Sequence, residues 1–122
     1  MLYKTAELEG ALLDVAVAHA KGWEFWIAPD QSICMVGVKG HFDDPLLDGE
    51  VFAPSTDWAQ GGPIIDKAKI SVLSDNRHIN GNWSGKTTNV ARTDIVRQWG
   101  PTPLIAAMRA YVASKLGNEV EL

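Results

Sequence analysis

The sequence predicts an α+β fold in which a small antiparallel sheet, of about three to five strands, packs against an N-terminal and a C-terminal α-helix. Two segments, one near each end, carry apolar residues at helical spacing and have helix-capping residues at their ends. Short runs rich in β-branched and aromatic residues lie between them. Helices and strands do not alternate regularly, and this order favours an antiparallel sheet over a parallel one.

Length and composition are those of one globular domain spanning residues 1–122. Apolar residues make up 46% and charged residues 21% of the chain, so a core can form without a metal or a disulfide. The single cysteine excludes an internal disulfide, which fits a reducing cytoplasm. With no charged-then-apolar leader and no apolar run of about 20 residues, neither secretion nor a membrane span is expected.

The formal net charge of −4 is unevenly distributed. Residues 1–61 hold three Lys or Arg and ten Asp or Glu, which leaves −7, whereas residues 62–122 hold eight and five, which leaves +3. A uniformly basic footprint for nucleic acid is therefore absent. Two interpretations stay open for the basic half: a solvated surface, or a patch that meets an acidic surface on another subunit.

The first helix is expected over Leu8–Lys21, ended by Gly22. Its spacing places Leu12, Val15 and His19 on the inner face and Asp14 on the outer face. A β-hairpin follows, with strands at 23–27 and 33–38 joined by a Pro-Asp turn.

The acidic stretch 39–50 predicts a loop. His41, Asp43 and Asp44 lack the spacing of a hard-cation site, so no metal is expected there.

A bend is predicted at 55–65, Ser-Thr-Asp-Trp-Ala-Gln-Gly-Gly-Pro-Ile-Ile. Ser55 would cap a short helical turn, the two glycines would break it, and the proline would start a second turn. The bend presents Asp57, Trp58 and Gln60. Two interpretations stay open: a Trp beside polar side chains lines a binding cleft, or it plugs the edge of the sheet.

The remaining middle part alternates weak strands and turns. A strand is predicted over 69–73, a turn over 74–76, and a loose strand or long loop around Trp83. Thr93 is interpreted as the cap of a short helical turn that holds Ile95 and Trp99.

The stretch 99–117 predicts the helix around which the chain is organised. Thr102 is a suitable N-cap, Pro103 fits the first helical position, and Gly117 is placed to end the helix. Between them the residues are almost all apolar or alanine, and only Arg109 and Lys115 carry charge. A helix with so little polar surface is expected to be covered on more than one side.

Known catalytic and metal-binding motifs are not matched, so neither catalytic residues, nor a cofactor, nor a metal ion is predicted. Gly85-Lys86-Thr87 is similar to the end of a phosphate-binding loop, but the first glycine and the strand-loop-helix context are missing. The three histidines and one cysteine are too scattered for a zinc site.

Three stretches, at 8–22, 55–65 and 100–117, resemble the NinX-like family of small proteins encoded by tailed phages and prophages. Together they cover 44 of the 122 residues and are spread from end to end of the chain. Strings of this length are specific, which indicates one family domain. The resemblance implies a phage or prophage gene product that acts in the cytoplasm of a bacterial host. It implies no activity and no cofactor.

The leading hypothesis is a non-enzymatic accessory protein that binds another protein or itself. The candidate binding surface comprises Ser55, Asp57, Trp58, Gln60 and Arg109.

One alternative is a small enzyme or small-molecule binder at the bend, with Asp57 as acid or base. Another is a nucleic-acid-associated factor that uses Arg92, Arg97 and Arg109 with a stacking Trp83 or Trp99, although the acidic first half argues against nucleic acid as the partner.

Overall fold

The computed structural model describes residues 2–22, 24–27, 33–37, 53–78, 81–89 and 94–122. The helical elements in the described residues are the 3-10 turn η1 (Thr5–Glu7), α1 (Gly10–Ala20), α2 (Trp58–Ala68) and α3 (Pro103–Leu116). The strands in the same residues are β1 (Leu2–Lys4), β2 (Glu24–Ile27), β3 (Ile33–Gly37), β4 (Ser71–His78), β5 (Gly81–Asn89), β6 (Asp94–Gly100) and β7 (Glu119–Glu121). The predicted α+β class is confirmed.

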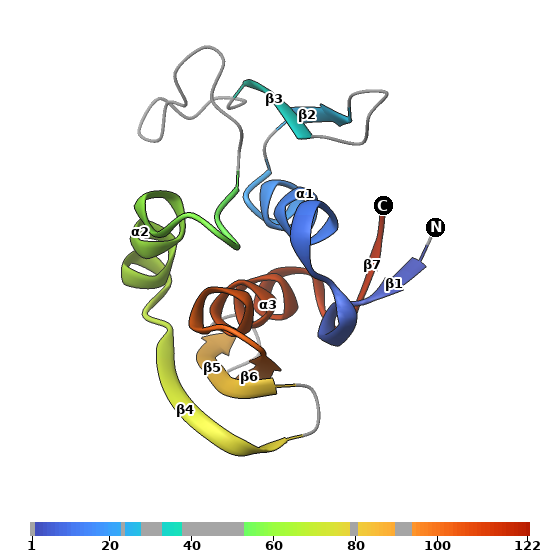
Figure 1. Cartoon of the computed structure of the whole chain (residues 1–122). Helices are drawn as coiled ribbons and strands as arrows, with labels where there is room; N and C mark the ends of the chain where they lie inside the picture. The colour runs from blue at the N-terminus through green and yellow to red at the C-terminus, as the bar shows by residue number, and fades with distance from the viewer. Residues whose placement is uncertain (1, 23, 28–32, 38–52, 79–80, 90–93) are drawn as a thin grey trace.

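Helix α3 lies at the centre of the fold (Figure 1). The hydroxyl of Thr102 accepts a hydrogen bond from the backbone N–H of Ile105 at 3.1 Å, and Pro103 begins the helix. Gly117 ends it with φ of +89°, a backbone conformation that favours glycine. Nine of its residues are buried: Leu104, Ala106, Ala107, Met108, Arg109, Ala110, Tyr111, Val112 and Ala113. The prediction that the last helix is covered on more than one side is therefore confirmed.

One side of α3 is covered by an antiparallel sheet with the strand order β4-β5-β6 (Figure 1). Two glycines in this sheet allow very close packing. A Cβ atom on Gly85 would lie 2.6 Å from the carbonyl oxygen of Ala106, and one on Gly100 would lie 2.7 Å from its nitrogen. Both distances are shorter than van der Waals contact, so the helix backbone rests directly on β5 and β6.

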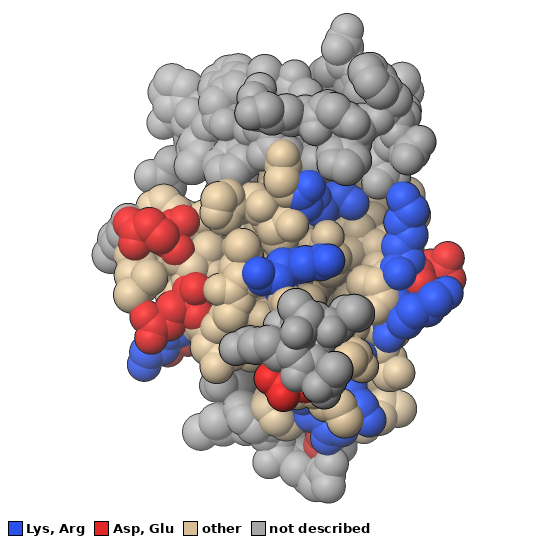
Figure 2. Space-filling view, turned by 180° about the vertical axis from the view of Figure 1, so that it is seen from behind, with Lys and Arg blue, Asp and Glu red and all other residues tan. Residues whose placement is uncertain are grey.

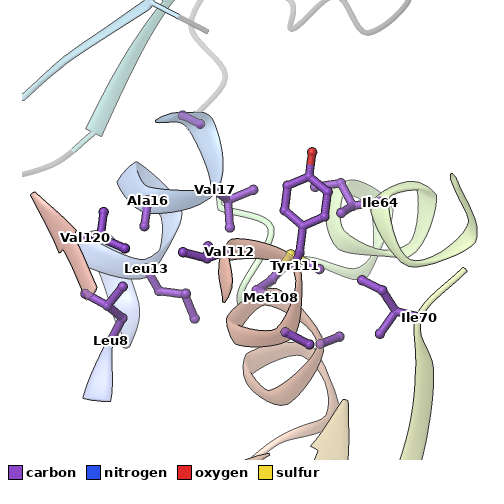
Figure 3. Packing of buried hydrophobic residues seen from close by; sticks show 13 residues of the cluster. Leu8, Leu13, Ala16, Val17, Ile64, Ile70, Met108, Tyr111, Val112 and Val120 are labelled. Carbon is purple, nitrogen blue, oxygen red and sulfur yellow. The ribbon is translucent and has the colours of Figure 1, made fainter. Parts of the chain in front are cut away.

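The other side of α3 carries the hydrophobic core, formed with α1, α2 and the segments at both ends of the chain (Figure 3). Met108, Tyr111 and Val112 project from α3 into this cluster. Its buried members are Leu8, Leu13, Ala16, Val17, Ala18, Ile64, Ile70, Ala107, Met108, Ala110, Tyr111, Val112 and Val120. Burial of such side chains, at about 1.5–3 kcal/mol for each large one, supplies the main stabilisation of the fold.

Helix α1 is buried over six consecutive residues, 13–18, instead of along one stripe. The predicted orientation is wrong at both of its ends: His19 is exposed and Leu12 is 38% exposed, whereas Asp14 is buried. The reason is that α1 is covered both by α3 and by the segment that precedes α2, where Ser55 bonds to Asp14.

Two further antiparallel pairs complete the described structure. β1 pairs with β7, with Tyr3 opposite Val120, so the two ends of the chain lie side by side (Figure 1). The predicted hairpin is confirmed as β2 paired with β3, next to α1. The acidic stretch 39–50 with His41, Asp43 and Asp44 lies outside the described residues.

The predicted bend at 55–65 is wrong, because one continuous helix, α2, runs through both glycines and the proline. Gly61 is needed for packing: a Cβ atom there would lie 2.5 Å from the carbonyl oxygen of Pro54 and 2.6 Å from Cδ2 of Leu104. Pro63 cannot donate to the carbonyl of Ala59, which weakens the helix locally. Burial of Ile64 against α3 holds the helix in place despite this loss.

Two local predictions in the sheet are also wrong. The turn expected at 74–76 lies inside β4, and the helical turn expected to hold Ile95 and Trp99 is strand β6. β4 pairs with β5 up to Ser74 and again at His78, with an irregular register between them, and β6 pairs with β5 along its whole length. Pairing with a neighbouring strand thus outweighs local propensity. The loose strand around Trp83 is confirmed as β5, while Thr93 lies outside the described residues.

Candidate functional site

Asp57 and Gln60, two members of the predicted binding surface, hold the start of α2. Asp57 is the N-cap, and its Oδ1 accepts from the N–H of Ala59 at 2.9 Å. Gln60 donates from Nε2 to Oδ2 of Asp57 at 3.2 Å, and its Oε1 accepts from the N–H of Ala53 at 2.9 Å. These hydrogen bonds explain both side chains by local structure.

The structure separates Ser55 from Trp58. Ser55 is buried, and its N–H donates to Oδ1 of Asp14 at 2.9 Å. Trp58 begins α2 and is 56% exposed. Ser55 therefore faces the interior and Trp58 faces solvent, so the two do not line one cleft.

Arg109 is buried and not part of an exposed surface. Its Nε donates to the carbonyl oxygen of Leu8 at 2.8 Å, and one terminal nitrogen donates to the carbonyl oxygen of Trp99 at 2.7 Å. Burial lowers the pKa of the guanidinium, and the charges of Glu9 and Glu7 act in the opposite direction. Arg109 thus links α3 to the N-terminal segment and to the end of β6.

The buried carboxyl of Asp14 is the most perturbed acid in the described part of the chain for which a value is resolved. Burial raises its pKa from 3.8 to about 6, while Ser55 acts in the opposite direction, mainly through its backbone N–H. The folded state therefore binds a proton at Asp14 more tightly than the unfolded chain does, so protonation of Asp14 stabilises the fold. This stabilisation is fully present below pH 3.8 and is lost as the pH rises through about 6.

Replacing Asp14 with asparagine is expected to stabilise the protein at pH 8, by up to about 3 kcal/mol, because it removes the buried charge. The amide oxygen still accepts the hydrogen bond from Ser55. Urea unfolding of the wild type and Asp14→Asn between pH 4 and pH 8 would measure the difference, which should shrink toward the acidic end. A variant less stable than the wild type at pH 8 would contradict this account.

The second surface of interest is the face of the β4-β5-β6 sheet that points away from α3. Gly85 and Gly100 point toward the helix, so side chains in the alternate positions lie on the opposite face. We call this the outer sheet face. It contains the cross-strand rows Leu73–Ser84–Trp99, Ser71–Lys86–Arg97 and Thr88–Ile95, and Asp75 next to Trp99.

Large apolar side chains remain exposed on the outer sheet face. Leu73 on β4 is 56% exposed and Ile95 on β6 is 65% exposed. Trp99 lies across the sheet from Leu73 and is fixed by donation from its Nε1 to Oδ2 of Asp75 at 3.3 Å. Exposed apolar side chains grouped on one sheet face are typical of an interaction surface.

Two cations lie directly opposite each other on the same face. Lys86 pairs in register with Arg97, and Arg97 is exposed to solvent. Like charges in directly opposite positions destabilise a sheet, so an anionic group bound between them would relieve a cost that the free molecule carries. The outer sheet face therefore combines apolar contacts with a place for negative charge.

This face was missed by the sequence-based prediction because the predicted turns interrupted both of its edge strands. The signal that identifies it is the alternation of Ile95, Arg97 and Trp99, which is typical of a strand. Of the residues predicted to bind nucleic acid, Arg97 and Trp99 lie on this face, whereas Arg109 is buried. Trp83 pairs with Gly100 on the face toward α3, and Arg92 lies outside the described residues.

In the part of the chain that the structure describes, three or more His, Cys, Asp or Glu residues do not come together to hold a metal ion. Within the same residues, each helix is too short or too polar to cross a membrane. A sequence-family model described as bacteriophage P22 NinX matches residues 4–115. A search of curated proteins finds no match.

Proposed function

The chain belongs to the bacteriophage P22 NinX family, and on this premise we propose that it is a non-enzymatic module that binds another protein or a second copy of itself in the cytoplasm of the bacterial host. The observation that carries this proposal is the outer sheet face, where Leu73 and Ile95 stay exposed beside Lys86 and Arg97. Apolar anchors with a polar and charged surround are the usual anatomy of a protein interface.

The hydrogen bonds made by three polar residues, Asp57, Arg109 and Asp14, support a binding role over an enzymatic one. Asp57 caps a helix, Arg109 bonds to two backbone carbonyls, and Asp14 holds the backbone of Ser55. Each of these three side chains therefore has a role in holding the fold together. Asp57 and Trp58 are the exposed members of the predicted surface at the start of α2. Asp57 is engaged as the N-cap of the helix, so Trp58 is the residue through which the alternative at this place can be tested.

Replacing Leu73 and Ile95 together with threonine is expected to weaken association by about a hundredfold, since two exposed apolar anchors contribute about 1–2 kcal/mol each at an interface. Threonine is compatible with a strand, so the fold should be retained. The measurement is sedimentation velocity at micromolar concentration, with 13.3 kDa as the mass of the monomer. Affinity capture from phage-infected cells, with wild type and variant in parallel, covers a partner other than the chain itself.

The matched control is Trp58→Ser, which removes an equally exposed apolar side chain from α2 and should leave association unchanged. Retained association in the Leu73→Thr/Ile95→Thr variant would contradict the proposal. Loss of association in Trp58→Ser alone would move the binding surface to the start of α2. A monomeric wild type whose captured proteins are the same as those of the double variant would also contradict it.

A further inference from the structure

We infer that the occupant of the outer sheet face is an acidic surface on a second copy of this chain. The inference rests on the proposed function above, and it adds the identity and the geometry of the partner. The acidic surface lies at the paired ends of the chain and comprises Glu7, Glu9, Glu119 and Glu121, all exposed. We call it the acidic pole.

The basic side of the contact is the opposed pair Lys86 and Arg97. Thr87 alternates with Lys86 and points toward α3, and its hydroxyl donates to the carbonyl oxygen of Ala68 at 3.0 Å, so α2 ends on the other face of the sheet. The exposed Lys67 and Lys69 at that helix end therefore do not belong to the outer sheet face. The acid on this face, Asp75, is buried and accepts from Trp99.

The acidic pole has a matching composition. In the β1–β7 pair, Leu2 lies opposite Glu121 and Lys4 opposite Glu119, and all four side chains are exposed. Leu2 is 57% exposed, so it offers an apolar contact beside the carboxylates. Carboxylates with an adjacent leucine fit a surface on which two cations lie beside exposed Leu and Ile side chains.

The two surfaces occupy different parts of the molecule. In Figure 1 the β1–β7 pair lies on one side of α3 and strand β4 curves around the other side. On the face drawn in Figure 2, two groups of acidic side chains lie at the left flank with a basic one below them, and most basic side chains lie in the middle and at the right, where further acidic side chains are also seen. One copy can therefore use its acidic pole and its outer sheet face at the same time.

This arrangement favours a head-to-tail contact over a two-fold one. Pairing the outer sheet face with itself about a two-fold axis near Lys86, on the central strand β5, would bring the Lys86–Arg97 pair of one copy against the same pair of the other, and like charges across an interface are strongly unfavourable. A head-to-tail contact places opposite charges together and continues from copy to copy, as a ring or an open chain. Single- or double-stranded nucleic acid is the weaker candidate because the acidic pole and the net charge of −4 repel phosphates.

The experiment uses charge reversal on each surface of the full chain. Arg97→Glu and Glu121→Lys are each expected to weaken self-association by at least about tenfold, because each places like charges together at the contact. An equimolar mixture of the two variants should restore association, since the acidic pole of Arg97→Glu still fits the sheet face of Glu121→Lys. The surfaces left free in that complex, the altered sheet face of Arg97→Glu and the altered pole of Glu121→Lys, also carry opposite charges, so alternating copies can continue beyond a one-to-one complex. Restored association also shows that both variants are folded.

The control for net charge is Lys21→Glu at the end of α1, which makes the same change in charge as Arg97→Glu and should leave association unchanged. Raising the salt concentration should weaken association of the wild type. If Arg97→Glu weakens association and Glu121→Lys does not, the outer sheet face binds something other than the acidic pole; the inference then fails while the proposed function stands. If the Leu73→Thr/Ile95→Thr variant associates normally, both fail. A monomeric chain that retains single-stranded DNA through Arg97 overturns both in favour of nucleic acid.

Discussion

Replacing Gly85 with alanine is expected to lower the free energy of unfolding by about 3 kcal/mol or more, at the upper end for a substitution that overfills a packed site. The added Cβ atom would lie 2.6 Å from the carbonyl oxygen of Ala106 and 2.9 Å from Cα of Ala107. Both are backbone atoms, so the clash cannot be relieved by turning a side chain. The helix or the strand must move, and the core on the far side of α3 must move with it. Thermal or urea unfolding measures the loss.

The control is the same substitution at Gly62, where an added Cβ atom meets nothing within 4 Å. Gly62 lies inside α2, so alanine should stabilise the protein there by about 0.5–1 kcal/mol through its higher helix propensity. If Gly85→Ala lowers the free energy of unfolding and Gly62→Ala raises it, close packing explains the loss at Gly85. Equal small effects would show that β5 and α3 are not in direct contact.

Replacing Arg109 with methionine is expected to lower the free energy of unfolding by about 3 kcal/mol. The guanidinium makes two charge-assisted hydrogen bonds, worth about 1.5–3 kcal/mol each, to the carbonyls of Leu8 and Trp99, and relief of the buried charge offsets part of this loss. Methionine keeps the length and the apolar contacts of the side chain. Urea unfolding at neutral pH checks the value.

Lysine at position 109 separates charge from geometry. It keeps the positive charge, but a single ammonium group cannot reach both carbonyls as the guanidinium fork does. Arg109→Lys should therefore be nearly as unstable as Arg109→Met. If Arg109→Lys keeps the stability of the wild type, charge alone explains the role of the residue, and the two hydrogen bonds contribute little.

The parts of the fold that could be predicted are those whose signal is local. Helix α3 was predicted because Thr102, Pro103 and Gly117 mark its ends, and because its almost uncharged composition requires cover on several sides. The pairing of β4 and β6 with β5 could not be predicted in the same way, since hydrogen bonds between strands depend on residues distant in sequence. Local turn and cap signals at Ser74 and Thr93 therefore gave the wrong element.

The candidate site shows the same limit. Asp57 and Gln60 were selected as polar residues beside a tryptophan, but their positions also suit a helix N-terminus, where they hold the backbone. Gly61 was interpreted as a helix breaker because the sequence does not reveal that Leu104 approaches it from another helix. The outer sheet face depends on three strands in register, so it becomes visible only after they are paired.

The position of α3 has a consequence for how the protein is made. The chain emerges from the ribosome with α1, α2 and the three-stranded sheet ahead of the helix that lies between them. A chain that ended at Gly100 would lack the helix against which Leu13, Val17 and Val72 pack, and these apolar side chains would be left uncovered. We therefore expect productive folding to wait for the last segment of the chain.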